Sequence, residues 1–344
     1  MSSASRPVAQ ASPAAVASPV AKPTGSLTSV RAGSLFGLLD TPWILAAARG
    51  YFQQAGLTLD VQRFDTIATM IPLLSTGQLD VAFDGATSAG FFNAFARGIN
   101  LRMVANQGVA RGTSDQRPYY AIVGSKALID AGKLQRIADL KGQPVNILAE
   151  GVLAQLLVDA ALKSDGLTLK DVQQQQMGFP DALPALKNGA IAASFLVEPF
   201  ITLGRQQGLL DVLVSGEKLA PDREITDVFY SSAFAQKRDA ANGFMVAYLQ
   251  GVRDYMRTFQ SSGADRTAAA IQLIPQLAVK EAAAYNVMGF PVINPDGRIN
   301  AADVKAQQDW YVSAGLVQQP IDVTQAIDNS FVDAALATLG PFKG

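Results

Sequence analysis

The sequence predicts an α/β protein of two lobes, each built on a doubly wound, mostly parallel sheet. Its 344 residues exceed one ordinary domain of about 100 to 200 residues. From Val30 onward a short unit repeats: an apolar strand, a residue that can cap a helix, a helix, and a glycine. Strands and helices that alternate with such short joints are typical of a parallel sheet with helices on both faces. A pause in this rhythm at the polar stretch Arg111–Pro118 indicates that the chain crosses there to a second lobe.

The first unit carries clear signals of a helix after a strand. Val30–Leu35 is the expected strand, Asp40 and Thr41 can cap, Pro42 suits the first helical position, and Gly56 ends the unit. The rest of the first lobe is expected, in chain order, as strand Leu59–Arg63, helix Ala68–Thr76, strand Leu79–Phe83, a helix capped by Thr87 or Ser88 that ends at Arg97, and strand Leu101–Ala105.

The second lobe repeats the same order of elements. Its expected elements are strand Tyr119–Val123, strand Val145–Leu148, helix Val152–Lys163, strand Val172–Met177, helix Asp181–Asn188 and strand Ile191–Val197. Leu74–Thr87 and Leu186–Pro199 are locally similar, since each has a helix end, a glycine, a strand and a polar turn. This similarity supports two lobes of like construction.

The remaining chain is expected to return to the first lobe. Val212–Val228 is rich in glycine, proline and charge, and Phe229–Ala233 has the pattern of a strand. Helices follow from about Gln236, and an apolar stripe of one of them indicates packing in the core. The stripe consists of Phe244, Tyr248, Val252, Tyr255 and Phe259. The expected division is therefore residues 26–108 with 229–344 as the first lobe, 119–214 as the second, and crossings near 109–118 and 215–228.

Residues 1–25 have the composition of a linker. They contain four prolines among alanine, serine and valine, and they lack the basic start and apolar centre of a signal peptide. We interpret this segment as a disordered surface tether that follows a lipid-bearing residue in the native form. An arbitrary disordered terminus is the alternative.

The composition excludes several classes of function. The chain has neither histidine nor cysteine, so disulfides, Cys/His zinc sites, thiolate nucleophiles and Ser-His-Asp triads are absent. Carboxylate, lysine or serine-lysine chemistry remains open. The net charge is −1, and the sequence contains no run of like charges that would favour binding to nucleic acid. No apolar stretch reaches the roughly 18 residues that are needed to span a membrane. We therefore expect no catalytic residues, metal, cofactor or nucleic-acid partner.

Five segments carry a resemblance to a known family. They are Ile44–Leu59 (ILAAARGYFQQAGLTL), Leu74–Ala82 (LSTGQLDVA), Asp139–Gly142 (DLKG), Asn188–Ala193 followed by Glu198 and Pro199, and Asp296–Gly315 (DGRINAADVKAQQDWYVSAG). In this order and spacing they resemble the nitrate, sulfonate, taurine and thiamine-precursor binding proteins of ABC importers. The resemblance implies a type II periplasmic-binding-protein fold, with the C-terminal helices in the first lobe and a small molecule held in the cleft. It also implies a non-enzymatic, extracytoplasmic protein, lipid-anchored in its native full-length form, whose closure is sensed by a membrane permease. We expect a monomer, since both lobe faces must stay free for the transporter.

Candidate ligand-binding residues lie where strands pass into helices. Ligands of open α/β sheets bind beyond the carboxyl ends of the strands, near free N–H groups of helices. The candidates are Phe36, Leu38, Asp40, Thr41, Trp43, Thr66, Ile67, Asp84, Gly85, Ala86, Thr87, Gln107, Glu150, Gly151, Phe179 and Glu198, together with Tyr119 and Tyr230 at the expected crossings. Capping is the alternative role of the threonines and Glu198, and core packing is that of the aromatic side chains.

Charge at these joints favours one kind of ligand. A tightly held sulfonate or nitrate is expected to meet arginine or lysine, yet the joints contain acidic residues and no basic one. We therefore expect a neutral or amine-bearing organic molecule, such as a flat heterocycle, although Arg111, Arg117 and Arg205 could still reach the cleft. An enzyme on the same fold and a ligand-sensing module for a signalling partner are the alternative functions.

Overall fold

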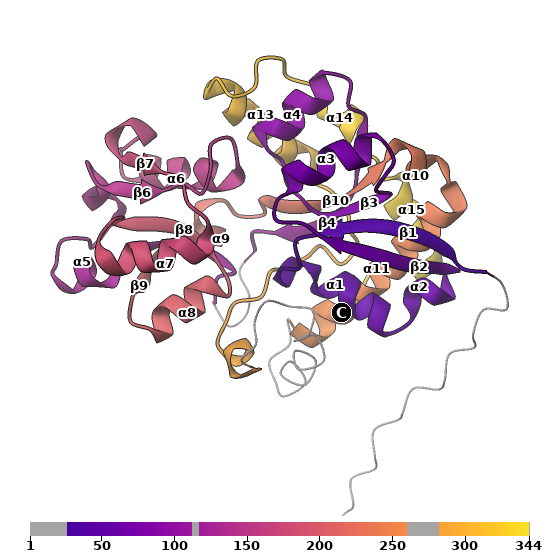
Figure 1. The fold of residues 1–344 in the computed structure, drawn as a ribbon, viewed down its shortest axis with the longest axis horizontal. Helices are drawn as coiled ribbons and strands as arrows, with labels where there is room; N and C mark the ends of the chain where they lie inside the picture. Colours follow the sequence, from indigo (N-terminus) through magenta and orange to yellow (C-terminus); the bar gives the residue numbers. More distant parts are fainter. Residues whose placement is uncertain (1–25, 112–116, 260–281, 344) are drawn as a thin grey trace, which may run out of the picture.

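The strands form two five-stranded sheets, one in each lobe (Figure 1). The computed structural model describes residues 26–111, 117–259 and 282–343, so the predicted tether of residues 1–25 lies outside the described residues. The first sheet has the order β2-β1-β3-β10-β4 and contains β1 (Thr28–Ser34), β2 (Leu57–Arg63), β3 (Val81–Gly85), β4 (Leu101–Val109) and β10 (Glu224–Ser231). The second has the order β7-β6-β8-β5-β9 and contains β5 (Tyr120–Ser125), β6 (Pro144–Asn146), β7 (Gln173–Gln175), β8 (Ala193–Val197) and β9 (Leu210–Ser215).

Each sheet has one antiparallel strand near its middle. In the first sheet β10 runs antiparallel to β3 and β4, while β1 is parallel to β2 and β3. In the second sheet β5 runs antiparallel to β8 and β9, while β6 is parallel to β7 and β8. Both antiparallel strands are the ones that the chain enters after crossing from the other lobe. The predicted two-lobed α/β fold with mostly parallel sheets is thus confirmed.

Helices cover both faces of the first sheet. One face packs against α1 (Thr41–Ala48), α2 (Tyr51–Gln54), α11 (Arg238–Phe259) and α15 (Ser330–Leu339). The other packs against α3 (Ile67–Ser75), α4 (Ala89–Ala96), α13 (Ala301–Ser313) and α14 (Val323–Ala326). The short elements of this lobe are η1 (Leu38–Asp40), α10 (Ser232–Gln236) and η4 (Ala282–Asn286). The predicted apolar stripe of α11 lies in the core, where its side chains are at most 2% exposed.

The second lobe is also covered on both faces. Its longest helix, α6 (Leu153–Ser164), packs on one face, and α7 (Phe179–Asn188) with α8 (Phe200–Gln206) packs on the other. Its short elements are α5 (Lys126–Asp130), η2 (Ile137–Leu140), η3 (Leu169–Asp171) and α9 (Gly216–Leu219). Figure 1 shows this lobe in magenta and pink beside a first lobe that combines indigo N-terminal with orange and yellow C-terminal segments.

The two crossings between the lobes lie side by side. The Ala110 N–H donates to the Arg223 carbonyl at 2.8 Å, and the Asp222 N–H donates to the Ala110 carbonyl at 2.8 Å. Arg111 and Asp222 add an exposed ion pair of 2.6 Å. Because the two connections are bonded to each other, the lobes are joined by a double hinge.

The structure corrects one part of the sequence prediction near this hinge. The stretch Val212–Val228 was expected to be irregular, but it contains parts of two strands. β9 extends to Ser215, and β10 begins at Glu224 rather than at Phe229. The reason is that β10 buries Glu224, Thr226 and Asp227, polar residues whose pattern is typical of exposed chain. The first strand of the protein, by contrast, begins two residues earlier and ends one residue earlier than predicted.

Among the helices that the structure describes, none combines the length and the apolar character needed to cross a bilayer.

Candidate ligand-binding site

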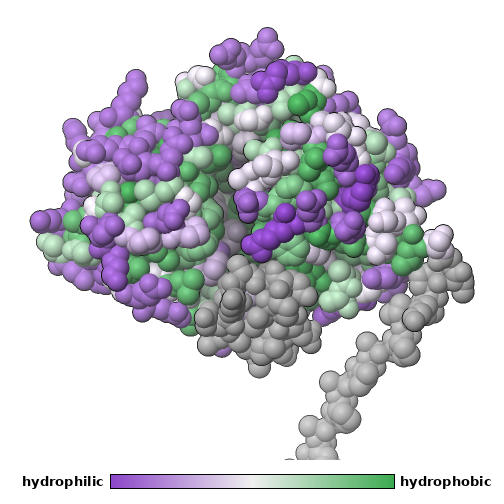
Figure 2. Space-filling view, in the orientation of Figure 1, coloured by the Kyte–Doolittle hydropathy of each residue, from purple (hydrophilic) through white to green (hydrophobic). Residues whose placement is uncertain are grey.

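The candidate site is the cleft between the lobes, which appears as a furrow in Figure 2. Three of the hydrogen bonds between described residues link the lobes around it. The Ala89 N–H donates to the Gly151 carbonyl at 2.9 Å, and the Gly289 N–H donates to Glu198 Oε1 at 3.2 Å. Trp310 Nε1 on α13 donates to Asp159 Oδ2 on α6 at 2.8 Å. These contacts hold the two walls of the cleft close together.

Two buried carboxyl groups face each other in the first lobe. Asp40 ends η1 and Asp84 lies in β3, and their side chains are 0% and 6% exposed. The carboxyl groups lie within hydrogen-bonding reach of each other. The Leu35 N–H donates to Asp84 Oδ2 at 3.0 Å, and the Gly37 N–H donates to Asp40 Oδ2 at 2.8 Å. We call these two residues the Asp40–Asp84 pair.

Both carboxyl groups of the pair hold protons more tightly than free aspartate does. Burial raises the pKa of Asp84 well above its usual value, and the neighbouring Asp40 raises it further. Burial also raises the pKa of Asp40, although hydrogen bonds from Asp84, Trp43 and Gly37 oppose this rise. No ion pair of the described residues involves either side chain. Two carboxyl groups within hydrogen-bonding reach share one proton more readily than they hold two negative charges.

Gln107 on β4 joins the pair to the sheet. Its side-chain oxygen accepts from the Asp84 N–H at 2.6 Å, and its Nε2 donates to the Leu39 carbonyl at 3.3 Å. The same Nε2 lies 3.5 Å from Asp40 Oδ1 and 3.5 Å from Asp84 Oδ1. Gln107 is fully buried, so its amide fixes the position of both carboxyl groups.

The backbone around the pair is strained. Phe36 and Asp84 have φ values of 56° and 60°, a region that residues other than glycine seldom occupy. Such strain costs on the order of 1–3 kcal/mol per residue and is concentrated at functional sites. The half-buried Phe36 ring packs edge-on against Trp43, with ring centroids 5.5 Å apart. We infer that the loop after β1 is shaped for a purpose other than stability.

Tyr119 extends from the first crossing toward the pair. Burial raises the pKa of its hydroxyl well above the usual value, and the charges of Asp84, Asp40 and Glu198 raise it further. The hydroxyl therefore stays neutral. Tyr119 is half-buried between the cores of the two lobes, as expected for a side chain at the base of the cleft.

Glu198 has a capping and bridging role in this structure. Its Oε2 accepts from the Thr202 N–H at 2.9 Å and its Oε1 accepts from the Thr202 hydroxyl at 2.8 Å, which caps α8. Oε1 also accepts from Gly289 of the first lobe. Of the two roles considered for Glu198, the structure thus shows the cap, and burial raises the pKa of its carboxyl.

Several predicted site residues lie in the core or are held by other groups. Tyr230 is fully buried and donates its hydroxyl to the Ala241 carbonyl at 3.0 Å, so its predicted place at a crossing is wrong. Trp43 is a core residue that stacks on Phe83 with centroids 5.2 Å apart. Thr87 is buried with its hydroxyl bonded to Gln307, whereas Ser88 caps α4. The sequence shows that these residues are aromatic or polar, but it does not show whether their side chains point into the core or into the cleft.

The other predicted residues line the joints in different ways. Leu38 is in the core, and the Thr41 hydroxyl donates to the Leu38 carbonyl at 2.7 Å. Phe179 packs on Phe195 and Phe200 of its own lobe. Gly85 has no room for a side chain, because a Cβ there would lie 2.8 Å from the Asp227 carbonyl. Ile67, Ala86, Thr66 and Glu150 are half-buried or exposed, as are Phe36, Tyr119 and Phe179.

Sequence reasoning missed two residues beside the pair. Ser34 is fully buried, bonds to Asp40, and accepts from the Phe36 N–H at 2.9 Å. Arg63 ends β2, and its guanidinium carbon lies 5.8 Å from the centroid of the Phe36 ring. Inclusion of the last residue of each expected strand would have found Arg63. It would not have found Ser34, because the expected strand ended at Leu35 and the observed β1 ends at Ser34.

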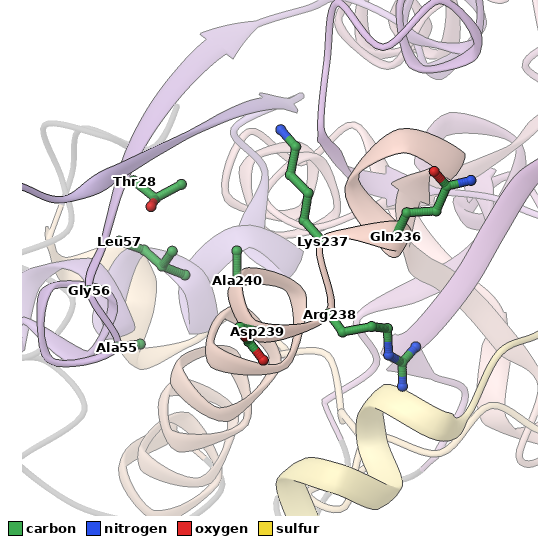
Figure 3. Close-up of a pocket in the computed structure, with 9 residues that line it drawn as sticks. All are labelled: Thr28, Ala55, Gly56, Leu57, Gln236, Lys237, Arg238, Asp239 and Ala240. Atoms are coloured by element: carbon green, nitrogen blue, oxygen red, sulfur yellow. The ribbon is translucent and has the colours of Figure 1, made fainter.

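A second depression lies at the opposite end of the first sheet, where β1 and β2 begin (Figure 3). It is lined by Thr28, Ala55, Gly56, Leu57 and residues 236–240. Its arginine is already engaged, because Arg238 Nη2 donates to Ser330 at 3.1 Å and the guanidinium lies 4.0 Å from the Phe331 centroid. Among the described residues, moreover, no group of three or more acidic side chains could hold a metal ion. The interlobe cleft is therefore the better candidate.

The two lobes and the cleft between them place this protein in the class of two-lobed proteins with a periplasmic-binding-protein fold. The family model described as "NMT1/THI5 like" matches residues 40–258. The chain therefore belongs to the NMT1/THI5-like family, which confirms the resemblance seen in the sequence.

Individual relatives agree with this assignment. The putative aliphatic sulfonates-binding protein of Escherichia coli (strain K12) is 26% identical over 274 residues, 75% of each chain. The riboflavin-binding protein RibY of Chloroflexus aurantiacus is 22% identical over 338 residues, 94% of this chain and 90% of that protein. The crystal structure of the periplasmic aliphatic sulphonate binding protein SsuA from Escherichia coli has a TM-score of 0.70 at 20% identity and covers 88% of this chain and 92% of that one. This last likeness supports the fold.

Proposed function

We propose that this chain captures a small organic molecule in its interlobe cleft and delivers it to an ABC importer. The ligand that we favour is neutral or amine-bearing and includes flat heterocycles, rather than a sulfonate or nitrate. The observation that carries this choice is the Asp40–Asp84 pair, a buried acidic centre without an ion-pair partner among the described residues. An acidic centre repels an anion and accepts hydrogen bonds from N–H groups.

The relatives are compatible with more than one ligand. One is described as binding aliphatic sulfonates and the other as binding riboflavin. Membership of the family therefore supports capture of a small molecule. The chemical class of that molecule has to be inferred from the residues of the site. Arg63 is a basic group near this site, where it packs over the Phe36 ring.

We infer a binding role rather than catalysis. The carboxyl oxygens of Asp40 and Glu198 already accept hydrogen bonds from the protein, and the sequence has no histidine or cysteine to serve as base or nucleophile. An enzyme on the same fold is the alternative, and it predicts that a bound compound is chemically altered.

The proposed partner is the permease of an importer, and the proposed location is extracytoplasmic, with a lipid anchor in the native form. A monomer suits this role, since both lobes must be free to meet the permease. The class of the protein supports the partner and location.

A thermal-shift screen tests the proposed function. The panel contains nitrate, alkylsulfonates, taurine, aromatic carboxylates, thiamine and its pyrimidine precursors, polyamines and nucleobases. A ligand at one hundred times its Kd adds about 2.7 kcal/mol to the free energy of unfolding, which raises Tm by several degrees. We expect a nitrogen-containing compound to raise Tm without being converted. A response to sulfonates alone contradicts the proposed ligand class, and product detected by mass spectrometry favours the enzyme.

A further inference from the structure

The two carboxyl groups of the Asp40–Asp84 pair have unequal surroundings. Asp40 accepts hydrogen bonds from the Gly37 N–H at 2.8 Å and from Trp43 Nε1 at 2.5 Å, and Ser34 bonds to it as well. Asp84 accepts from the Leu35 N–H at 3.0 Å, while Gln107 Nε2 lies 3.5 Å from an oxygen of each carboxyl group. Because donors favour the ionised form, the negative charge belongs on Asp40 and the proton on Asp84, which donates it to Asp40. Asp84 is also the more exposed of the two residues, at 6% against 0%.

The groups that face the pair from neighbouring elements do not compete for this proton. Burial raises the pKa of Tyr119 on the crossing and of Tyr248 on α11 well above the usual value, so both stay neutral. The Tyr248 hydroxyl donates to the Asn106 carbonyl at 3.1 Å. Glu198, across the cleft, is held by Thr202 and Gly289. Arg63, at the end of β2, packs over the Phe36 ring.

We propose that ligand capture is linked to proton release: Asp84 holds a proton in the unliganded protein, and a ligand with a cationic nitrogen replaces that proton in the cleft. This inference rests on the proposed function and narrows its ligand class to cations. A positive charge beside a carboxyl group favours the ionised form. When the cation enters, the O–H bond of Asp84 breaks, its proton leaves to solvent, and an N–H···O hydrogen bond to the carboxylate takes its place. One proton is released for each cation bound.

The link between cation binding and proton release predicts the direction in which the affinity changes with pH. Since binding releases a proton, the affinity for a cation rises with pH, by up to about tenfold per pH unit, until Asp84 is ionised in the free protein. A neutral ligand leaves the proton in place, so its affinity is flat over the same range. The strained backbone at Asp84 supports a role of this residue in binding, because strain is retained where geometry serves function.

Calorimetric titration with benzamidine and benzamide tests this proposal. The two probes have nearly the same shape, but benzamidine is a cation at neutral pH and benzamide is neutral. Titrations at pH 7 in two buffers of different ionisation enthalpy give the number of protons released. We expect about one proton for benzamidine, none for benzamide, and tighter binding of benzamidine as the pH is raised.

Two variants make the result specific to the pair. Asp84→Asn keeps the size of the side chain but cannot ionise, so benzamidine should bind at least tenfold more weakly without releasing a proton, while the affinity for benzamide is retained. If this variant does not fold, Asp40→Asn serves instead: it removes the charge that keeps the proton on Asp84, and the proton release at pH 7 should fall.

Two results overturn the proposal. One is benzamidine binding without proton release, and the other is no benzamidine binding at millimolar concentration. If neutral compounds of the thermal-shift panel still raise Tm, the proposed function survives and only the proton linkage fails. If no compound of the panel binds, the proposed function itself fails.

Discussion

At the scale of single residues, Glu224 has the clearest consequence for pH. It lies in β10 near the hinge, where Oε1 accepts from the Asn300 N–H at 2.6 Å and Oε2 accepts from the Asn106 side chain. Burial raises its pKa to about 7, against an ordinary value of 4.5, despite these donors. Asp227 beside it is fully buried, and burial followed by the charge of Glu224 raises its pKa well above the usual value.

Glu224→Gln tests this shift through stability. A carboxyl group whose pKa is raised by folding stabilises the folded state most when it is protonated, so its contribution is complete below pH 4.5 and is lost as the pH rises through about 7. The glutamine variant cannot lose a proton, and its unfolding free energy should depend less steeply on pH. Urea unfolding of both proteins at pH 5 and pH 8 measures the difference. Parallel pH profiles would show that Glu224 has an ordinary pKa in the folded protein.

The sequence located the acidic centre but not every neighbour. Asp40 and Asp84 were predicted as site residues because each follows a strand, and joints after parallel strands share one edge of the sheet. Trp43 and Tyr230 were misjudged for a different reason. An aromatic side chain near a helix or strand end packs into the core or turns to the cleft according to tertiary contacts, and local pattern contains no information about these contacts.

At the scale of elements, the start of α9 depends on close packing against β5. A Cβ on Gly216 would lie 1.8 Å from the Tyr120 ring, too close for any side chain. Gly216→Ala should therefore lower the free energy of unfolding by about 1–3 kcal/mol, because the ring or the second crossing must shift. Chemical denaturation measures this change. Gly90→Ala is the matched control: Gly90 is exposed in α4, its nearest contact is 3.7 Å away, and alanine there should be neutral or slightly stabilising.

The elements that were hardest to predict lie at this same hinge. Strand β9 was missed and β10 was started too late, because glycine, proline and charge in Val212–Val228 indicate irregular chain. In the structure the Glu224 side chain of β10 is buried with specific partners from distant parts of the chain, since it accepts from the Asn300 N–H and from the Asn106 side chain. A buried polar strand follows from long-range pairing, which a local pattern does not contain.

At the scale of the whole molecule, the contact between α13 and α6 acts as a clasp between the lobes. The indole N–H of Trp310 donates to Asp159, which also accepts from Lys163 at 2.6 Å. Trp310→Phe removes this donor and keeps an aromatic ring, so about 1 kcal/mol of the contact between the lobes is lost. We expect a more open average shape in the unliganded protein, seen as a larger radius of gyration in small-angle scattering, with Tm nearly unchanged. Ser313→Ala on the exposed side of α13 is a control, and equal scattering from all three proteins would show that the contact does not hold the lobes together.

The position of β10 has a consequence for the order in which the protein folds during its synthesis. This strand lies between β3 and β4 and completes the first sheet, although it follows the whole second lobe in the chain. The first lobe therefore leaves the ribosome with a gap in the middle of its sheet, whereas β5 to β9 emerge as one uninterrupted set. The first sheet can therefore be completed only after the second lobe has been synthesised. When β10 leaves the ribosome, the second lobe can already be folded on the other side of the cleft.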